Sequence, residues 1–268
     1  MVYLESFPDP RPQTVFATGT HTTVGSSGAG KALNFASLGA DATLWGLIGD
    51  DNEGARVRSY LMERGVELLP VTDPKGTMRH INLMDDDGSR ISIFAQPGSH
   101  EFTVDVDQVR PFARVADIVS VTIMNYCRQF LPMLRELGKA VWIDIHDYDG
   151  SNPYHKEFID AADYLFMSST SHPDWRGFCE ERIGAGTTAA IATHGSAGAS
   201  GLTATEGWVN VPAVAVNELV DTNGAGDAFF AGFATTWIAG SDLQTALESG
   251  AAHAARAVAS PDLAPVVG

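Results

Sequence analysis

Hydrophobic and polar positions along the chain follow the pattern of alternating strands and helices. From Ala36 onward, short runs rich in aliphatic and β-branched residues are separated by longer stretches with helical spacing. The runs that we expect to be strands cover residues 43–48, 118–121, 140–145, 164–167 and 189–193. This alternation is typical of a parallel sheet with crossover helices. The sequence therefore predicts an α/β fold.

One region has the period-two pattern of a β-hairpin instead. Polar and apolar residues alternate over 78–84 and 90–96, and the turn signal Asp85-Asp86-Asp87-Gly88 lies between them. The segment 14–24 is rich in Thr and Val and is a candidate for a further strand. We expect a small sheet that overhangs the main one. Its second face could cover a substrate, pair with a second subunit, or do both.

Length and charge limit the function classes. With 268 residues and 44% hydrophobic content, the chain suits one large domain. Asp and Glu total 33 against 17 Lys and Arg, a formal net charge of -16, so nucleic acid is a poor partner for this surface. A small anion such as a nucleotide can still bind at a helix N-terminus, where backbone N–H groups supply positive potential.

The cysteines and the N-terminus suggest a compartment. Cys127 and Cys179 are the two cysteines, and their spacing does not fit a Cys-x-x-Cys motif. We interpret them as ordinary thiols in a reducing environment. The N-terminus lacks a basic region followed by an apolar one, and no apolar run approaches the roughly 20 residues needed to cross a bilayer. The sequence predicts a soluble, cytoplasmic protein.

The segment 220–232 contains the most informative chemistry. Gly224 and Gly226 precede an amphipathic helical run, so backbone N–H groups can close on an anion at the helix N-terminus. Asp227 follows at the start of that helix, where an N–H-rich setting keeps a carboxylate ionised and able to accept a proton. A carboxylate beside a phosphate site suggests phosphoryl transfer. The alternative is that Asp227 only caps the helix.

A resemblance favours the first alternative. The string Asp221-Thr-Asn-Gly-Ala-Gly-Asp227 resembles the Asp-Thr-x-Gly-Ala-Gly-Asp signature of the ribokinase-like, or PfkB, carbohydrate kinase family. The resemblance implies ATP-dependent phosphorylation of a hydroxyl on a sugar or sugar-like molecule. It also implies roles for four residues: Gly224, Ala225 and Gly226 would stabilise the developing charge of the γ-phosphate, and Asp227 would act as the general base.

The resemblance also implies a fold. The family's fold is a three-layer α/β sandwich with a mostly parallel central sheet and a small β-sheet lid. By this comparison, residues 1–268 form a single kinase domain, with lid segments at about 12–24 and 76–98. Residues 25–39 and 46–54 are similar to the family's N-terminal signature, which ends in Gly-x-x-Gly-Asp-Asp-x-x-Gly. The Ala-rich helix expected at 243–258 would flank the adenine of ATP.

Further site residues follow from the same resemblance. The turn after the strand at 189–193 is similar to a Thr-x-Gly-x-x-Gly nucleotide loop, and with the phosphate turn it implies a set of ATP contacts: Thr193, Gly195, Gly198, Asn223, Gly224 and Gly226. The implied substrate contacts are Gly25, Ser26, Ser27, Asn82, Asp144, His146 and Asp227. His80, Asn82 and Gln96 lie on the hairpin, where contact with substrate and contact with solvent remain equal alternatives.

The chain departs from the family pattern at several positions. Family members open with a strand that ends in a substrate-binding Asp, and this chain starts after it, so we expect either a start upstream of Met1 or a pocket built without that Asp. Ser26 replaces the second glycine of a Gly-Gly pair, and Gly30 replaces a substrate-binding Asn. The Asn-x-x-Glu motif that organises Mg²⁺ falls at Ser168-Ser-Thr-Ser171, which has no carboxylate.

The cation requirements are therefore only partly defined. We expect Mg²⁺ to arrive bound to ATP, with its protein ligands unknown. The loop 260–263 lacks the glycine common in members that bind a monovalent cation, so activation by potassium stays open.

Three other motifs have competing interpretations. Residues 25–32 nearly spell a P-loop, whose lysine would contact phosphates, but Ala32 lacks the hydroxyl that would hold Mg²⁺. The run 144–149 suits either a metal site or a cleft wall followed by a solvated turn. Aromatic residues at Phe229, Phe230, Phe233 and Trp237 have helical spacing and are interpreted as core.

The hypothesis is thus a PfkB-type sugar kinase that forms a homodimer through its lid. The alternatives are a nucleoside kinase of the same fold and a non-catalytic regulator that binds a nucleotide or sugar. A dinucleotide oxidoreductase is disfavoured, because no Gly-x-Gly-x-x-Gly follows a first strand.

Overall fold

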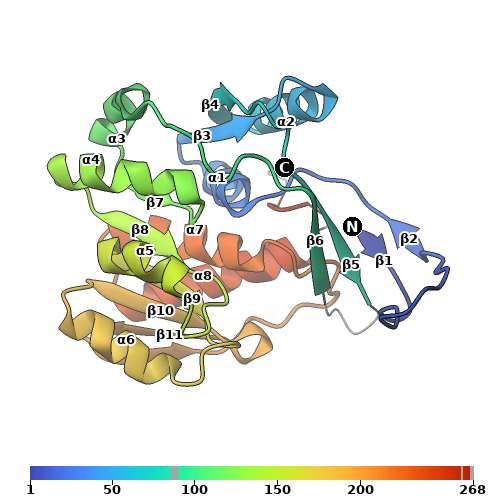
Figure 1. Ribbon diagram of the computed structural model, residues 1–268. Helices are drawn as coiled ribbons and strands as arrows, with labels where there is room; N and C mark the ends of the chain where they lie inside the picture. Colours follow the sequence, from blue (N-terminus) through green and yellow to red (C-terminus); the bar gives the residue numbers. More distant parts are fainter. Residues whose placement is uncertain (86–89, 261, 266–268) are drawn as a thin grey trace.

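A six-stranded sheet forms the centre of the molecule, in the order β12-β11-β10-β9-β8-β7 (Figure 1). The computed structural model describes residues 1–85, 90–260 and 262–265. Strands β7 to β10 are parallel, and β11 and β12 continue the sheet antiparallel. The strands are β7 (Val119–Val121), β8 (Val141–Asp144), β9 (Tyr164–Ser168), β10 (Ala189–Thr193), β11 (Ala199–Thr203) and β12 (Gly207–Val211). The predicted parallel α/β sheet is confirmed for four of the five expected strands, whereas the strand expected at 43–48 belongs to a separate sheet.

Helices cover both faces of this sheet because successive side chains on each strand point to opposite sides. Val141 and Ile143 pack under the helices of one face, whereas Trp142, between them, packs under those of the other. The first face carries α3 (Arg110–Val115), α4 (Leu131–Glu136), α5 (Lys156–Ala161) and α6 (Trp175–Gly184). The second carries α1 (Ser27–Ser37), α7 (Ala225–Ile238) and α8 (Leu243–Val258). The result is a three-layer sandwich.

Two glycines allow α7 and α8 to pack closely. A Cβ at Gly232 would lie 2.8 Å from the backbone oxygen of Ser249, and one at Gly250 would lie 2.9 Å from that of Phe229. The aromatic residues of α7 fill the space between the helices and the sheet: Phe230 and Phe233 are fully buried and Trp237 is partly buried. The interpretation of this aromatic group as core is confirmed.

A second, two-stranded parallel sheet lies beside the first. It consists of β3 (Ala42–Ile48) and β4 (Val66–Thr72), joined by α2 (Asn52–Glu63). Trp45 of β3 packs edge-on against Phe130, with ring centroids 4.9 Å apart, and so links this sheet to the core of the first face. Short 3-10 helices complete the connections: η1 (Val106–Gln108), η2 (Asn125–Phe130), η3 (Pro153–His155) and η4 (Gly195–Ala197).

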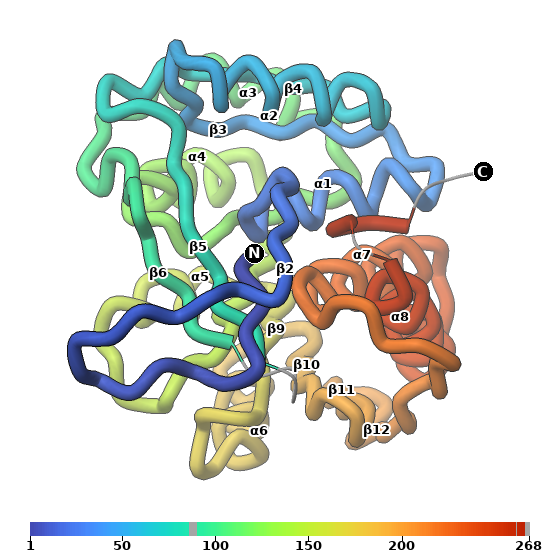
Figure 2. Tube along the Cα trace, turned by 90° about the vertical axis from the view of Figure 1, so that its right-hand side faces the viewer, coloured from blue at the N-terminus to red at the C-terminus, as the bar shows by residue number. Residues whose placement is uncertain are grey.

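A four-stranded sheet projects to one side of the sandwich, in the order β2-β1-β5-β6 (Figures 1 and 2). β5 (Arg79–Met84) and β6 (Arg90–Gln96) pair antiparallel, as the hairpin pattern predicts, although residues 86–88 of its turn lie outside the described residues. The segment 12–24 forms only the two-residue strand β2 (Gly19–Thr20). β1 (Val2–Tyr3), which the sequence analysis did not identify, lies between β2 and β5.

The cysteines and the helices bear on two expectations, one about disulfide bonds and one about membrane-spanning segments. Cys127 and Cys179 are both buried and unpaired. No helix within residues 1–85, 90–260 or 262–265 is long and apolar enough to cross a membrane.

We expect Gly232→Ala to destabilise the fold by about 1–3 kcal/mol, because the added methyl group overlaps the α8 backbone in a packed core. The measurement is the urea unfolding midpoint. Gly184→Ala is the matched control: this helical glycine has no atom within 4 Å of an added Cβ, so its free energy of unfolding should stay within about 1 kcal/mol of wild type or rise. Equal losses in the two variants would contradict the close packing of α7 and α8.

Candidate active site

The N-terminus of α1 forms one wall of the site. Ser26 caps the helix by accepting a hydrogen bond from the Ala29 N–H at 3.2 Å, and it does so with a positive φ of 90°. Side chains rarely adopt this conformation, which explains why a glycine at this position is common in the pattern that the chain resembles. Ser27 is the first helical residue, and its hydroxyl donates to Asp227 Oδ1 at 2.9 Å.

The N-terminus of α7 forms the opposite wall. Gly224 precedes the helix with a left-handed φ of 82°, and the carboxylate of Asp221 holds the turn by accepting from the Asn223 N–H at 2.8 Å. No atom lies within 4 Å of a Cβ built on Gly226, so there is open space beside this first turn. The first turn of a helix has N–H groups without intrahelical partners. The turn therefore has the geometry of an anion site, with Asp227 at its edge.

A lysine that the sequence analysis did not assign to the site lies between these walls. Lys31 of α1 is 4% exposed, and its ammonium group donates to three oxygen atoms. These are Ser27 Oγ at 2.6 Å, Asp227 Oδ1 at 2.6 Å and Asp144 Oδ2 at 3.0 Å. The near-P-loop motif would make this lysine a phosphate ligand, but its partners in the structure are two carboxylates and a serine hydroxyl.

Gly30 is the residue against which Asp227 packs. A Cβ at position 30 would lie 2.3 Å from Asp227 Oδ2 and 2.9 Å from its Cγ. No side chain larger than hydrogen fits there while Asp227 keeps this orientation. Glycine at this position, where the resemblance implies an Asn, therefore leaves the space that the Asp227 carboxylate occupies.

Asp144 and His146 extend the cluster from the end of β8. His146 has a left-handed φ of 54°, its N–H donates to Asp144 Oδ1 at 2.9 Å, and its Nδ1 lies 3.5 Å from Asp144 Oδ2. Burial raises the pKa of Asp144, but the charges of His146 and Lys31 and their hydrogen bonds outweigh it and lower the pKa to about 2. Asp144 is therefore ionised at neutral pH.

Burial and charge act in opposite directions on the Lys31–Asp227 pair. Desolvation raises the pKa of Asp227, Lys31 offsets part of that rise, and the pKa stays above its usual value. Desolvation lowers the pKa of Lys31, but the two carboxylates more than compensate and raise it. Lys31 is thus a stable cation, and of its two carboxylate partners Asp227 is the one more easily protonated.

The loop after β10 forms a second group of candidate residues. Gly198, with a φ of 101°, has no room for a side chain, because a Cβ would lie 2.0 Å from the Val211 carbonyl oxygen. His194 orders the loop: Nδ1 lies 2.7 Å from Ser169 Oγ and Nε2 lies 2.8 Å from Ser200 Oγ. Burial lowers the pKa of His194, so its ring is neutral at neutral pH. Thr193 and Gly195 bound the turn at the same sheet edge as His146, since β8 and β10 run parallel.

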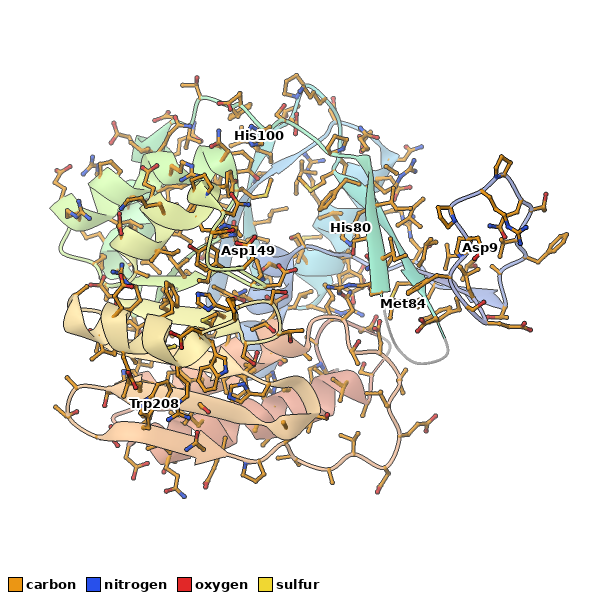
Figure 3. The ribbon with its side chains drawn as sticks, turned by 60° about the horizontal axis from the view of Figure 1, so that its bottom comes forward. Asp9, His80, Met84, His100, Asp149 and Trp208 are labelled. Carbon is orange, nitrogen blue, oxygen red and sulfur yellow. The ribbon has the colours of Figure 1, made fainter. Side chains whose placement is uncertain are left out.

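The four-stranded sheet, which carries His80 on β5 (Figure 3), contacts both walls. The His80 ring lies over Gly25, with Cε1 3.3 Å from an ideal Cβ at that position, and it packs against Phe94 with centroids 5.5 Å apart. Arg90 donates to Asn223 Oδ1 at 3.0 Å and so connects β6 to the turn that precedes α7. Of the other hairpin residues, Asn82 accepts from Ser92 Oγ at 2.7 Å, and Gln96 donates to the Lys75 carbonyl oxygen.

The candidate residues thus fall into three groups. Ser27, Asp144, His146 and Asp227 form one contact network, with Lys31 at its centre. Gly25, Ser26, Asn223, Gly224, Ala225 and Gly226 line the adjacent helix termini. Thr193, Gly195 and Gly198 have no contact in the described part of the chain that joins them to Asp227, and Asn82 is buried against its own hairpin.

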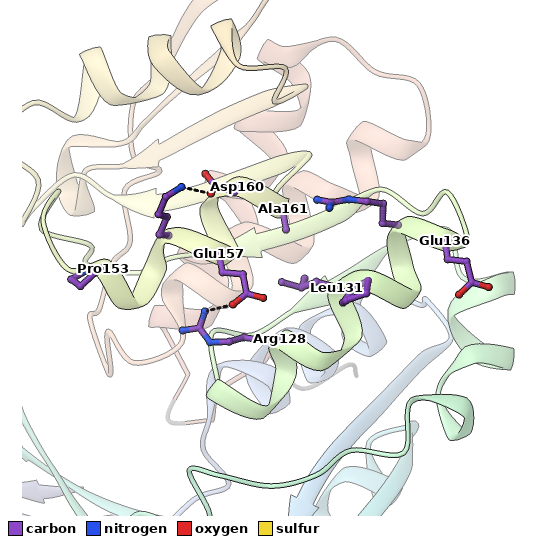
Figure 4. A pocket seen from close by; sticks show the side chains of 10 residues that line it. Arg128, Leu131, Glu136, Pro153, Glu157, Asp160 and Ala161 are labelled. Carbon is purple, nitrogen blue, oxygen red and sulfur yellow. Dashed lines mark hydrogen bonds and ion pairs between the residues drawn. The ribbon is translucent and has the colours of Figure 1, made fainter.

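A hollow of about 770 Å³ elsewhere on the surface has no site residue in its lining (Figure 4). It lies between α4 and α5, where Arg128 pairs with Glu157 and Lys156 pairs with Asp160. Because these four charged side chains pair with one another, they are not free to converge on a ligand.

The sequence and the fold both match known kinases. The family model described as "pfkB family carbohydrate kinase" matches residues 1–265. The acarbose 7(IV)-phosphotransferase of Actinoplanes sp. is 30% identical over 97% of this chain and 89% of that protein. The ATP-dependent ribose-1-phosphate kinase of Halopiger xanaduensis is 33% identical over 84% and 76%. A solved microbiome-derived acarbose kinase superposes with a TM-score of 0.86 at 30% identity, covering 97% and 88% of the two chains.

We expect Gly30→Ala to destabilise the protein by about 1–3 kcal/mol, because the methyl group overlaps the Asp227 carboxylate. In an Asp227→Ala background the carboxylate is absent, so the same change should cost less. The measurement is a double-mutant cycle of urea unfolding free energies, with an expected coupling of at least about 0.5 kcal/mol. Additive effects would show that Asp227 does not lie against Gly30.

Proposed function

Because this chain belongs to the pfkB family of carbohydrate kinases, we propose that it transfers the γ-phosphoryl group of ATP to a hydroxyl of a sugar or sugar-like molecule, with Asp227 as general base. The observation that supports this most directly is the position of Asp227. One of its oxygens accepts from Ser27 and Lys31, and the other accepts no hydrogen bond from the residues that the structure describes. This second oxygen is available to a substrate hydroxyl.

The proposed reaction is an in-line transfer. Asp227 Oδ2 takes the proton of the acceptor hydroxyl as that oxygen attacks the γ-phosphorus of ATP, and ADP leaves. Backbone N–H groups of Gly224, Ala225 and Gly226 stabilise the charge on the transferred phosphoryl oxygens. The open space beside Gly226 and the left-handed turn at Gly224 support this placement.

ATP would extend from this turn toward the loop 193–198, with α8 beside the adenine. Kinases of this family use ATP, and we propose that Mg²⁺ enters as part of the Mg-ATP substrate. The donor set supports this, since Ser168, Ser169 and Thr170 offer hydroxyls where a carboxylate would be needed. Residues 1–85, 90–260 and 262–265 also contain no group of three or more His, Cys, Asp or Glu that could hold a metal ion.

The substrate would lie between the α1 N-terminus and the hairpin. Gly25, Ser26, Ser27 and His146 would contact its hydroxyls, with Asp144 beneath. His80 and Phe94 support a lid role for the four-stranded sheet, because they share one face of the hairpin and His80 already covers Gly25. An aromatic platform of this kind suits the apolar face of a sugar ring.

We expect Asp227→Asn to reduce ADP formation by at least about 10²-fold, because the amide cannot take the proton. The measurement is ADP release with Mg-ATP and a panel of sugars, sugar phosphates, acarbose and nucleosides, together with ATP binding by calorimetry. ATP affinity should change little. Asp117→Asn, an exposed residue outside the site, is the control and should match wild type.

The outcomes separate the alternatives. Near-normal turnover in Asp227→Asn would exclude Asp227 as the base. Activity confined to nucleosides would favour the nucleoside kinase. Ligand-induced stabilisation with no ADP from any acceptor would favour a non-catalytic regulator.

The outer face of the hairpin supports a homodimer. Ile81 pairs with Ile93 and Leu83 pairs with Ile91, so these four apolar residues share one face, and the three isoleucines are exposed. An exposed apolar sheet face of this kind is typical of a subunit interface. We propose that a second copy of the chain covers it.

We expect Ile93→Glu to convert the protein to a monomer, because a carboxylate would be buried without a partner in that interface. Light scattering after size-exclusion chromatography measures the mass. Val115→Glu, at an apolar position on α3 that is even more exposed, should leave the oligomeric state unchanged. A monomeric wild-type protein at micromolar concentration would overturn the proposal.

A further inference from the structure

Lys31 places a buried positive charge in direct contact with the proposed base. We infer that Lys31 is a positioning residue of the phosphoryl transfer: its ammonium group keeps Asp227 ionised and holds Oδ1, so that Oδ2 is directed at the acceptor hydroxyl. This inference rests on the proposed function for its kinetic consequences, but the contact itself does not depend on it. Lys31 is a positioning residue because it acts through Asp227 rather than on the substrate.

The hydrogen-bond geometry assigns every proton of the ammonium group. An ammonium has three N–H donors, and Lys31 directs them at Ser27 Oγ, Asp144 Oδ2 and Asp227 Oδ1. The Phe230 ring closes the site, with its centroid 5.0 Å from Nζ. No donor remains for a phosphate oxygen of ATP, so a P-loop type of contact would require Lys31 to leave its carboxylates.

The burial of two carboxylates makes the positive charge of Lys31 necessary. Asp227 and Asp144 have side chains only 12% and 11% exposed, and both are acids that burial alone would neutralise. The ammonium of Lys31 compensates for one carboxylate and is shared between the two. A base that is protonated cannot accept the proton of the acceptor, so the ionised state of Asp227 is a condition of the reaction.

The charged groups around Asp227 raise or lower its pKa according to the sign of their charge. Lys31 comes from α1, and Asp144 and His146 come from the end of β8, while α7 itself contributes the Phe230 ring. The charges of Lys31 and His146 lower the pKa of Asp227, and the charge of Asp144 raises it. Removing Lys31 and removing Asp144 should therefore shift the titration of Asp227 in opposite directions.

The first measurement is the titration of the Asp227 carboxyl by ¹³C NMR, assigned with Asp227→Asn, and it needs no turnover. We expect Lys31→Met to raise the titration midpoint by about one to three pH units, since the opposite charge is lost. Asp144→Asn, which keeps Lys31, should lower it. Lys31→Arg retains the charge and should leave the midpoint near that of wild type. Lys156→Met, an exposed lysine outside the site, is the control and should cause no change.

The second measurement is the pH dependence of kcat for ADP release. In Lys31→Met the acid limb should move up with the NMR midpoint, so that on this limb kcat falls about tenfold for each pH unit of the shift, and kcat should recover at higher pH. A residue with only a structural role would lower kcat equally at all pH values. Such a uniform loss, or an unchanged NMR midpoint in a folded variant, would overturn the inference.

The two measurements distinguish the possible failures. If Lys31→Met does not fold, the downward shift in Asp144→Asn still tests the coupling of charges, and its absence contradicts the inference. If the NMR midpoints shift as expected but wild-type protein forms no ADP with any acceptor, the proposed function fails while the link between Lys31 and Asp227 stands.

Discussion

An ammonium group buried between two carboxylates is the interaction on which the site depends. It joins α1 to α7 and both helices to the end of β8, segments that lie 113 and 196 residues from Lys31 along the chain. Charges in such a site are stable only when each has a partner, and removing one partner leaves the other exposed to the full cost of desolvation. The positions of the two helices and of the central sheet are therefore coupled through one cation.

The architecture could be predicted from the sequence because the patterns that indicate strands and helices are local and periodic. The alternation of strands and helices predicts the parallel part of the central sheet, and the ends of α8 agree with the expected 243–258. β1 was missed because Val2 and Tyr3 are too few to show a pattern, and their partners on β5 lie 81 residues away. The segment 14–24 was overestimated because a composition rich in Thr and Val favours a strand without specifying a partner.

The active site could be predicted from the sequence only in part. The turn at Gly224 to Asp227 is visible because backbone geometry and side chains are encoded in adjacent residues. Lys31 was not assigned to the active site, because its partners come from distant segments. The sequence around it also resembles a P-loop, which is a different kind of phosphate site. Two features pointed toward it: a lysine among the apolar residues of a helix face, and its position four residues after Ser27, one helical turn away. Neither feature identifies Asp144 or Asp227 as the partner.

Gly30 determines how this site can change in evolution. Because its hydrogen occupies the space where a Cβ would meet Asp227, any larger residue at position 30 requires a different Asp227 orientation and thus a different environment for Lys31. The effect of a substitution at one of the three positions then depends on the residues at the other two, which is epistasis with a steric origin. Residues 30, 31 and 227 are therefore expected to vary together rather than one at a time.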